Sequence, residues 1–236
     1  MKLAVEPRTV LTLAVENLRR AILEGVFTPG QRLVEADLMA RLRISRPSLR
    51  EALRTLEAER LIVITPNRGP SVAILSWETA QQIYKVRALL EGEAAALCAA
   101  RPDKGVLERM ETALKAFASA VKAIDPAGRI KSTSDFYEAI QTGSDNQIIE
   151  ELLQGLLSRI NYLRTRSMAN GQRARESLKE MTAIRDAIRA GKPDAARAAS
   201  HIHIENASKA AELAFAAAAN DKSVERSRRD VSAIAE

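Results

Sequence analysis

The feature that most constrains the fold is a change of hydrophobic period within the first 75 residues. Apolar residues recur at helical spacing over 9–25, 35–42 and 46–59. Two β-branched runs then follow, LIVIT at 61–65 and SVAIL at 71–75, on either side of the turn residues PNRGP. Three helices followed by a two-stranded hairpin predict a winged helix-turn-helix over residues 1–75.

From Ser76 onward the pattern is helical throughout, which makes the chain mostly α. Pro, Gly and Asn residues punctuate it, and the helices are separated by short connections. Such connections predict an all-α antiparallel bundle over 76–219, followed by a flexible tail over 220–236, where charge is balanced and apolar content low. The predicted helices cover residues 77–101, 103–123, 129–142, 146–169, 172–190 and 193–219.

Composition narrows the class of protein. Cys98 is the only cysteine, so no internal disulfide forms, and no apolar run is long enough to span a membrane. We expect a soluble cytoplasmic protein that needs no cofactor. The formal net charge is +6, and residues 1–75 hold 12 Lys and Arg against 8 Asp and Glu. A basic balance permits an anionic partner such as DNA but does not identify one.

The helix predicted from residue 46 has the features of a DNA-reading helix. Ser45 is a suitable N-cap, and Pro47 falls in the first turn, where a missing N–H costs little. Arg46 and Arg50 lie one turn apart on the polar face, near the helix start, where recognition helices reach base edges. A guanidinium can bond the O6 and N7 atoms of guanine with two hydrogen bonds. Arg54 continues this basic face.

Further residues around this helix suit contacts with the phosphate backbone. Ser45 and Ser48 offer hydroxyls beside the helix-start amides. Arg68 and Gly69 fall at the tip of the predicted hairpin, where a basic side chain and a compact backbone can approach a duplex. The plain alternative is an ordinary solvated helix face. The capped start, the helix–turn–helix spacing and the following hairpin together favour binding to double-stranded DNA.

The segment LVEADLMARLRISRPSLREALRTLEAERLIVITPNRGPSV resembles the winged-helix domain of GntR-type bacterial transcriptional regulators. Its most specific parts are SRPSLREAL and the R-G-x-x-V pattern of the wing. The helical remainder is similar to the FCD domain of the FadR-like branch, so the resemblance covers about residues 9–219. It implies DNA contacts by Arg46, Ser48, Arg50 and Gly69.

The same resemblance implies a homodimer that binds a two-fold symmetric operator. It also implies that a small effector in the helical domain changes the affinity for DNA. One position departs from the pattern, because many members carry a basic residue where this chain has Ala36. One DNA contact of the family is therefore expected to be missing.

Most FCD domains bind a divalent metal ion through an Asp or Asn and three histidines. At the matching positions this chain has Thr133, Tyr137 and Met181, and only His203 is retained. A hydroxyl, a phenol, a thioether and one imidazole form a poor divalent site, so we expect no metal. Asp135 is two residues from both Thr133 and Tyr137 and should face away from them.

The bundle is then expected to hold a metal-free effector pocket, with a carboxylate as a possible ligand. Arg87 is a candidate partner for its anionic group, but an ion pair with Glu91 one turn on is an equal alternative. Tyr137 and His203 can likewise simply hydrogen-bond each other in a filled core. The candidate effector residues are Arg87, Thr133, Tyr137, Asn146, Met181 and His203.

Three functions follow from these alternatives. The first is a dimeric DNA-binding regulator controlled by a small organic acid. The second is a repressor with a filled core that responds to no effector. An enzyme built on the helical domain is disfavoured, because the chain has two histidines, no nucleophile–base pair and no glycine-rich phosphate loop.

Overall fold

The computed structural model describes the backbone of residues 10–168 and 171–234, and side chains as far as residue 218. The chain divides into two compact units. One comprises the residues up to Ser76 together with 155–162, and the other comprises 77–154 and the residues from Leu163 onward. Each unit has its own fold and is described by itself.

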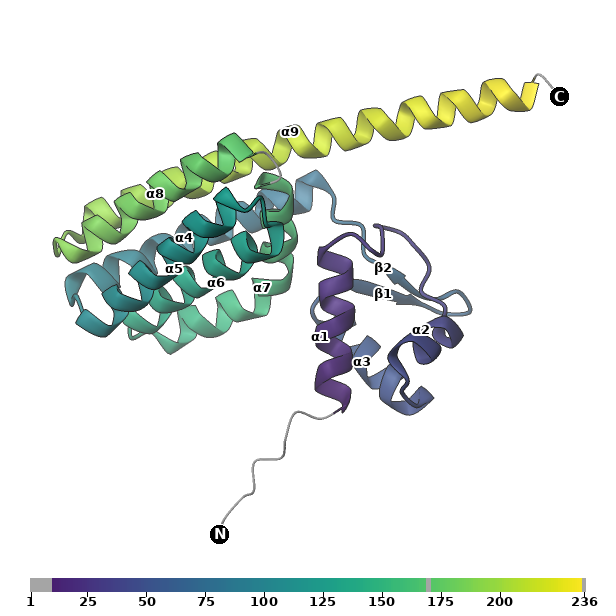
Figure 1. Cartoon of the computed structure of the whole chain (residues 1–236), viewed down its shortest axis with the longest axis horizontal. Helices are drawn as coiled ribbons and strands as arrows, with labels where there is room; N and C mark the ends of the chain where they lie inside the picture. Colours follow the sequence, from purple (N-terminus) through teal and green to yellow (C-terminus); the bar gives the residue numbers. More distant parts are fainter. Residues whose placement is uncertain (1–9, 169–170, 235–236) are drawn as a thin grey trace, which may run out of the picture. The chain divides into compact units, whose positions relative to one another are not determined.

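The first unit is a winged helix-turn-helix, as the sequence predicts. It contains the helices α1 (Val10–Leu23), α2 (Glu35–Leu42) and α3 (Arg46–Ala58), followed by the strands β1 (Ile62–Thr65) and β2 (Gly69–Val72) (Figure 1). The two strands pair antiparallel, with Thr65 opposite Gly69 and Ile62 opposite Val72. The segment before α2 adds to the other edge of β2, through a bridge between Arg32 and Ser71.

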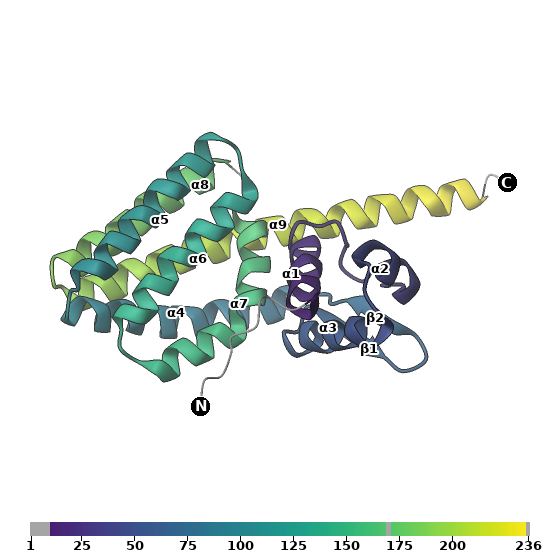
Figure 2. The same cartoon turned by 60° about the horizontal axis from the view of Figure 1, so that its bottom comes forward.

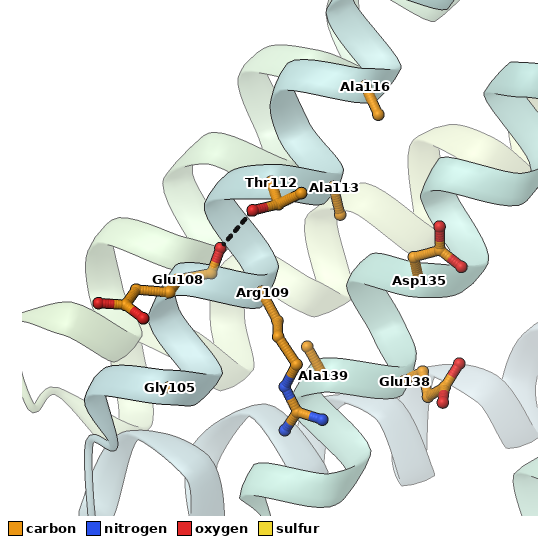
Figure 3. A pocket seen from close by; sticks show the side chains of 9 residues that line it. All are labelled: Gly105, Glu108, Arg109, Thr112, Ala113, Ala116, Asp135, Glu138 and Ala139. Carbon is orange, nitrogen blue, oxygen red and sulfur yellow. Dashed lines mark hydrogen bonds between the residues drawn. The ribbon is translucent and has the colours of Figure 1, made fainter.

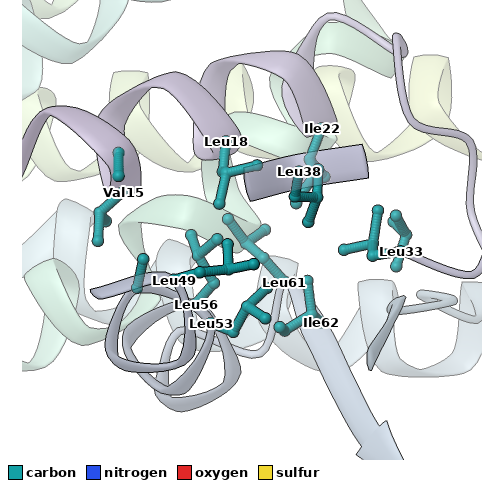
Figure 4. Close-up of a cluster of buried hydrophobic side chains, with 13 residues drawn as sticks. Val15, Leu18, Ile22, Leu33, Leu38, Leu49, Leu53, Leu56, Leu61 and Ile62 are labelled. Atoms are coloured by element: carbon teal, nitrogen blue, oxygen red, sulfur yellow. The ribbon is translucent and has the colours of Figure 1, made fainter. Parts of the chain in front are cut away.

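An apolar core holds these elements together (Figure 4). Leu49 and Leu56 of α3 have no exposed surface, and Leu38 of α2 retains 2%. Burying a leucine completely stabilises a fold by roughly 1.5–3 kcal/mol. The inner face of α3 is thereby fixed, and its arginines are turned outward. The labelled core residues are Val15, Leu18, Ile22, Leu33, Leu38, Leu49, Leu53, Leu56, Leu61 and Ile62.

The second strand lies two residues earlier than the sequence predicts, at 69–72 instead of 71–75. Gly69 and Pro70 have the composition of a turn, which places them outside the strand in a sequence-based prediction. In the structure Gly69 has a positive φ of 78° and begins the strand directly after the hairpin tip. Pro70 is buried and lies opposite Ile64.

The second unit is the predicted helical bundle (Figures 1 and 2). Helix α4 packs against α6, α8 and α9, while α5 packs against α6 and α8. It contains the helices α4 (Trp77–Ala100), α5 (Lys104–Lys122), α6 (Pro126–Gly143), α8 (Gly171–Arg189) and α9 (Pro193–Ile234). It also contains both ends of α7 (Gln147–Ser167), whose middle residues 155–162 belong to the first unit.

Two helix boundaries differ from the prediction. Helix α6 begins at Pro126 and not at 129, because the Asp125 carboxylate caps it by accepting a 3.0 Å hydrogen bond from the Gly128 N–H. Helix α9 extends to Ile234, where the sequence predicts a flexible tail from residue 220. No glycine or proline follows Pro193 to end this helix.

The buried face of α4 is rotated from the predicted apolar stripe. Ile83 and Ala94 are buried as expected, but Val86 is 41% exposed. Arg87 and Glu91 are buried in its place, with 1% and 2% exposure. Hydrophobic periodicity assigns charged residues to the surface. It therefore cannot predict that two charged residues neutralise each other inside the bundle.

Candidate functional site

The start of α3 is built by a serine cap. Ser45 has extended backbone angles, φ −69° and ψ 157°, and its hydroxyl accepts a hydrogen bond from the Ser48 N–H at 3.4 Å. The two serine hydroxyls lie 3.0 Å apart. Pro47 occupies the first turn, where helices tolerate proline. These residues fix where the helix begins and leave the exposed Ser45 and the half-buried Ser48 hydroxyl at its N-terminus.

The outer face of α3 is basic and open. The side chains of Arg46, Arg50 and Arg54 retain 62%, 60% and 73% of their surface. Glu35 of α2 lies between the first two, with Nε–Oε distances of 3.9 Å to Arg46 and 3.3 Å to Arg50. Arg54 pairs instead with Glu51 on its own helix. One carboxylate therefore holds both guanidinium groups that the sequence singles out.

The hairpin tip has the compact form that the sequence suggests. Arg68 is exposed, and its backbone N–H donates to the Thr65 carbonyl at 3.1 Å. Around Gly69, a side-chain Cβ would meet nothing within 4 Å, although the positive φ strains other residues there. The tip thus leaves room for a close partner. Glu35 was not anticipated, because sequence spacing does not show that α2 and α3 approach at this point.

A buried polar cluster lies inside the second unit, centred on α4. Arg87 Nε donates to Glu91 Oε1 at 2.9 Å, and Nη2 lies 3.3 Å from Oε2. Burial lowers the pKa of Arg87, but the Glu91 carboxylate more than offsets this and keeps the pKa above its usual range. The ion-pair interpretation of Arg87 therefore describes the structure.

Tyr137 of α6 and Arg164 of α7 form the next part of this cluster. The Arg164 guanidinium carbon lies 5.3 Å from the centre of the Tyr137 ring. Among the described residues, the buried Tyr137 hydroxyl has no hydrogen-bond partner, and burial raises the pKa of its phenol. Burial and the positive charge of Arg87 lower the pKa of Arg164 to about 10.

His203 of α9 completes the cluster with two residues of α8. Its Nδ1 lies 2.8 Å from Oε2 of Glu180, which also accepts a 2.8 Å hydrogen bond from Arg173 Nη2. Asn206 donates to the other carboxylate oxygen. The prediction of a hydrogen bond between Tyr137 and His203 is therefore wrong. The His203 imidazole bonds the Glu180 carboxylate instead, and the centres of the Tyr137 and His203 rings are 6.0 Å apart.

The remaining candidates are only partly brought together. The Thr133 hydroxyl donates to the Arg129 carbonyl at 2.8 Å and lies 3.9 Å from the Met168 sulfur. Met181 is fully buried. Asn146 caps α7 instead, accepting a 3.1 Å hydrogen bond from an N–H in its first turn. Arg129, Arg164, Arg173 and Glu180 were missed, because no spacing in the sequence shows that their helices converge.

These side chains do not fit a divalent metal ion. The position-matched donors are a hydroxyl, a phenol and a thioether, while the one imidazole is already bonded to Glu180. Among the described residues, no group of three or more His, Cys, Asp or Glu side chains is placed to hold a metal. Asp135 faces away, as expected, and pairs with Lys131 at 2.9 Å.

An open groove of about 430 Å³ runs along the outside of α5 and α6 (Figure 3). Three acidic side chains, one arginine and three alanines line it, and the Thr112 hydroxyl donates a hydrogen bond to the Glu108 carbonyl. Its donors do not converge on one point, so it lacks the features of a ligand site. The lining residues are Gly105, Glu108, Arg109, Thr112, Ala113, Ala116, Asp135, Glu138 and Ala139.

Within the part of the chain that the structure describes, no helix combines the length and apolarity needed to cross a membrane. A winged helix-turn-helix with an exposed arginine face, in a chain that also contains an α-helical bundle, defines a DNA-binding transcriptional regulator.

Comparison with known proteins shows the family. Residues 13–72 match the model of bacterial regulatory proteins of the gntR family, and residues 82–206 match the FCD domain. The chain belongs to the GntR family of transcriptional regulators, in the branch that carries an FCD domain.

Two curated relatives and one solved structure illustrate this likeness. The uncharacterized HTH-type transcriptional regulator YdhC of Bacillus subtilis is 28% identical over 77% of this chain and 81% of its own length. The Glc operon transcriptional activator of Escherichia coli is 31% identical over 64% of this chain and 67% of its own. The crystal structure of a putative GntR regulator from Rhodococcus matches with a TM-score of 0.72 at 27% identity, covering 84% of this chain and 95% of that one.

Proposed function

We propose that the protein is a dimeric regulator that inserts α3 into the major groove of a two-fold symmetric operator. Arg46 and Arg50 read base edges, and Ser45 and Ser48 bond phosphates at the helix start. The observation that carries this assignment is the exposed arginine face on a capped helix whose other face is locked in the core. Arg54 and the hairpin tip at Arg68 and Gly69 add contacts with the phosphate backbone of the operator.

Selection of bound sequences from a random duplex pool tests this function. We expect two inverted half-sites about 34–36 Å apart, or about 10 base pairs. Arg50→Ala should lose about 1–3 kcal/mol at one base pair of each half-site and relax the preference there. Arg101→Ala removes an equal charge from an exposed position of the second unit and serves as the control. Unchanged base discrimination in Arg50→Ala would contradict the assignment.

The homodimer is supported by apolar side chains left exposed on the second unit. The apolar face of α7 is only half buried. Leu153 and Ile160 are inside, but Ile148 and Leu152 of α7 are 64% and 53% exposed. Sedimentation of Ile148→Lys/Leu152→Lys should show a loss of dimer relative to Ile202→Lys, which alters an exposed residue of α9. A dimer of undiminished affinity would exclude this face.

We infer further that a small organic acid, bound in the second unit without a metal, changes the affinity for the operator. The hydroxyl, phenol, thioether and imidazole donors described above support a site without a metal ion, and stoichiometric zinc, nickel or manganese in the purified protein would contradict it.

A specific observation favours the rival function, an effector-independent repressor. The charged side chains of the cluster pair among themselves, as Arg87–Glu91 and Glu180–His203. A ligand at about 100 times its Kd stabilises its protein by about 2.7 kcal/mol. Thermal-shift screening of organic acids therefore separates the two.

A further inference from the structure

The turn that joins α2 to α3 contains an arginine in a strained backbone conformation. Arg43 has a φ of 54° and a ψ of 46°, which lie in the left-handed region. Entering this region costs free energy for a residue that has a Cβ, whereas glycine enters it readily. Such strain persists where the surroundings fix the backbone, and it is frequent at functional positions. The long basic side chain at this position therefore calls for a function.

The packing around the turn holds Arg43 at the surface. Leu42 and Ile44, on either side of it, pack against the apolar core of the first unit, while Arg43 is exposed. The three arginines of the outer face of α3 each pair with a glutamate. Arg43, in contrast, has no ion-pair partner among the described residues. Its positive charge is therefore available to a partner outside the chain.

Arg43 lies at the end of α2 that is next to the N-terminus of α3. It is two residues from Ser45, so their Cα atoms are at most about 7 Å apart. The Ser45 cap, the free N–H groups and the positive end of the helix dipole make this helix start suitable for a phosphate. The opposite end of α2 is acidic, with Glu35 and Asp37 in its first turn. A phosphate beside α2 is therefore attracted to the end at Arg43.

We propose, on the basis of the DNA-binding function above, that Arg43 binds a phosphate of the operator backbone next to the start of α3. In a helix-turn-helix the first helix crosses the DNA backbone, which brings the following turn close to a strand. The contact adds affinity and fixes the position of α3, but it reads no sequence, because every nucleotide carries the same phosphate. A purely structural role, as a cation beside the C-terminal carbonyl groups of α2, predicts no effect on DNA binding.

The test is the salt dependence of DNA binding by the full chain, measured by fluorescence anisotropy with the selected operator and with a scrambled duplex. Arg43→Asn removes the charge, and asparagine tolerates the left-handed region. We expect the slope of log K against log salt concentration to decrease in magnitude by about 0.9 for each half-site. At about 0.1 M salt the affinity should fall about fivefold or more for each half-site. Both duplexes should lose the same factor, which separates a phosphate contact from a base contact.

Arg60→Asn is the matched control. Arg60 is another exposed arginine of the first unit with a positive φ, 59°, but it follows the opposite end of α3, roughly 20 Å away along the helix. Arg60→Asn should keep the wild-type affinity and slope, and Arg43→Lys should restore both to within about twofold, because lysine keeps the charge. The Tm of Arg43→Asn should be no lower than that of the wild type, so weaker binding reports a lost contact and not a loss of folding.

Three results would overturn the proposal: an unchanged salt slope in Arg43→Asn, an equal loss in Arg60→Asn, or a loss confined to the operator. A selected operator that Arg43→Asn binds with the wild-type salt slope refutes only this inference. Failure to select any operator refutes the proposed function, and an equal loss of binding to unrelated duplexes in Arg43→Asn would then still support the phosphate contact.

Discussion

At the scale of single residues, arginine is used in three different environments. Arg50 is exposed and pairs with the carboxylate of Glu35, which also pairs with Arg46 one turn away. Arg87 is buried and fully neutralised by Glu91. Arg173 is buried, and two of its nitrogens have no hydrogen-bond partner among the described residues. The sequence identifies the first of these from its position on a capped helix. It does not identify the third, because a buried charged cluster depends on side chains from several helices.

Glu35 should influence how α3 meets DNA. Exposed ion pairs contribute about 0–1 kcal/mol, so Glu35→Gln should leave stability nearly unchanged. It removes a negative charge beside the DNA-reading face and releases the two arginines it positions. We expect about threefold tighter binding to a scrambled duplex and a smaller ratio of specific to non-specific affinity. Fluorescence anisotropy with both duplexes measures this, and Asp37→Asn, on the same helix, is the control. Equal behaviour of the two variants would exclude a positioning role.

His203 should make the second unit sensitive to mild acid. Burial lowers its pKa despite the neighbouring Glu180, so the unfolded chain binds the proton more readily than the folded one. The free energy of unfolding should therefore decrease as the pH falls below about 6.5. Glu180, whose pKa is lowered by His203 and Arg173 against the effect of burial, should add a further loss at lower pH.

Urea unfolding at pH 7.5 and 5.5 tests this dependence. His203→Gln should flatten it, whereas His201→Gln, at an exposed position of the same helix, should not. A pH dependence that persists unchanged in His203→Gln would assign it to other groups.

At the scale of helices and strands, the sequence is most informative where chain chemistry is local. Ser45 and the prolines mark helix starts, and the hydrophobic period gives the order of elements. Errors arise where residues have two uses. Pro126 is the first residue of α6, although the sequence predicts that this helix begins at residue 129. Gly69 and Pro70 belong to a strand, although both residue types favour turns. The sequence does not predict the rotation of the buried face of α4, because that rotation depends on packing between helices. Arg87 and Glu91 can be buried there since they neutralise each other.

Two helical glycines should respond oppositely to alanine. At Gly143 of α6, a Cβ would lie 2.7 Å from the Cys98 sulfur and 2.9 Å from a Val106 methyl, so Gly143→Ala should destabilise by about 1–3 kcal/mol. At Gly155 of α7, a Cβ would meet no atom of the described residues within 4 Å, and Gly155→Ala should stabilise by about 0.5–1 kcal/mol. Chemical denaturation of both variants measures this. A destabilised Gly155→Ala would show that this face of α7 is covered.

At the scale of the whole molecule, two units with separate cores carry separate binding tasks. The first presents an arginine face suited to a large polyanion, and the second encloses a cluster of buried charged side chains. A regulator needs a coupling free energy between two such sites, and coupling is reciprocal. If an effector changes the Kd for the operator by some factor, the operator must change the Kd for the effector by the same factor.

This reciprocity gives a prediction for the full chain. In the absence of DNA, Arg50→Ala should bind the effector with wild-type affinity, and in the absence of effector Tyr137→Phe should bind the operator with wild-type affinity. The double variant should show each loss at its single-variant value, within about 0.5 kcal/mol, because the altered side chains share no partner. Titration calorimetry and anisotropy, each with and without the second ligand, supply the four Kd values needed. Unequal coupling factors measured from the two directions would show that the effector and the operator are not bound by the same folded population.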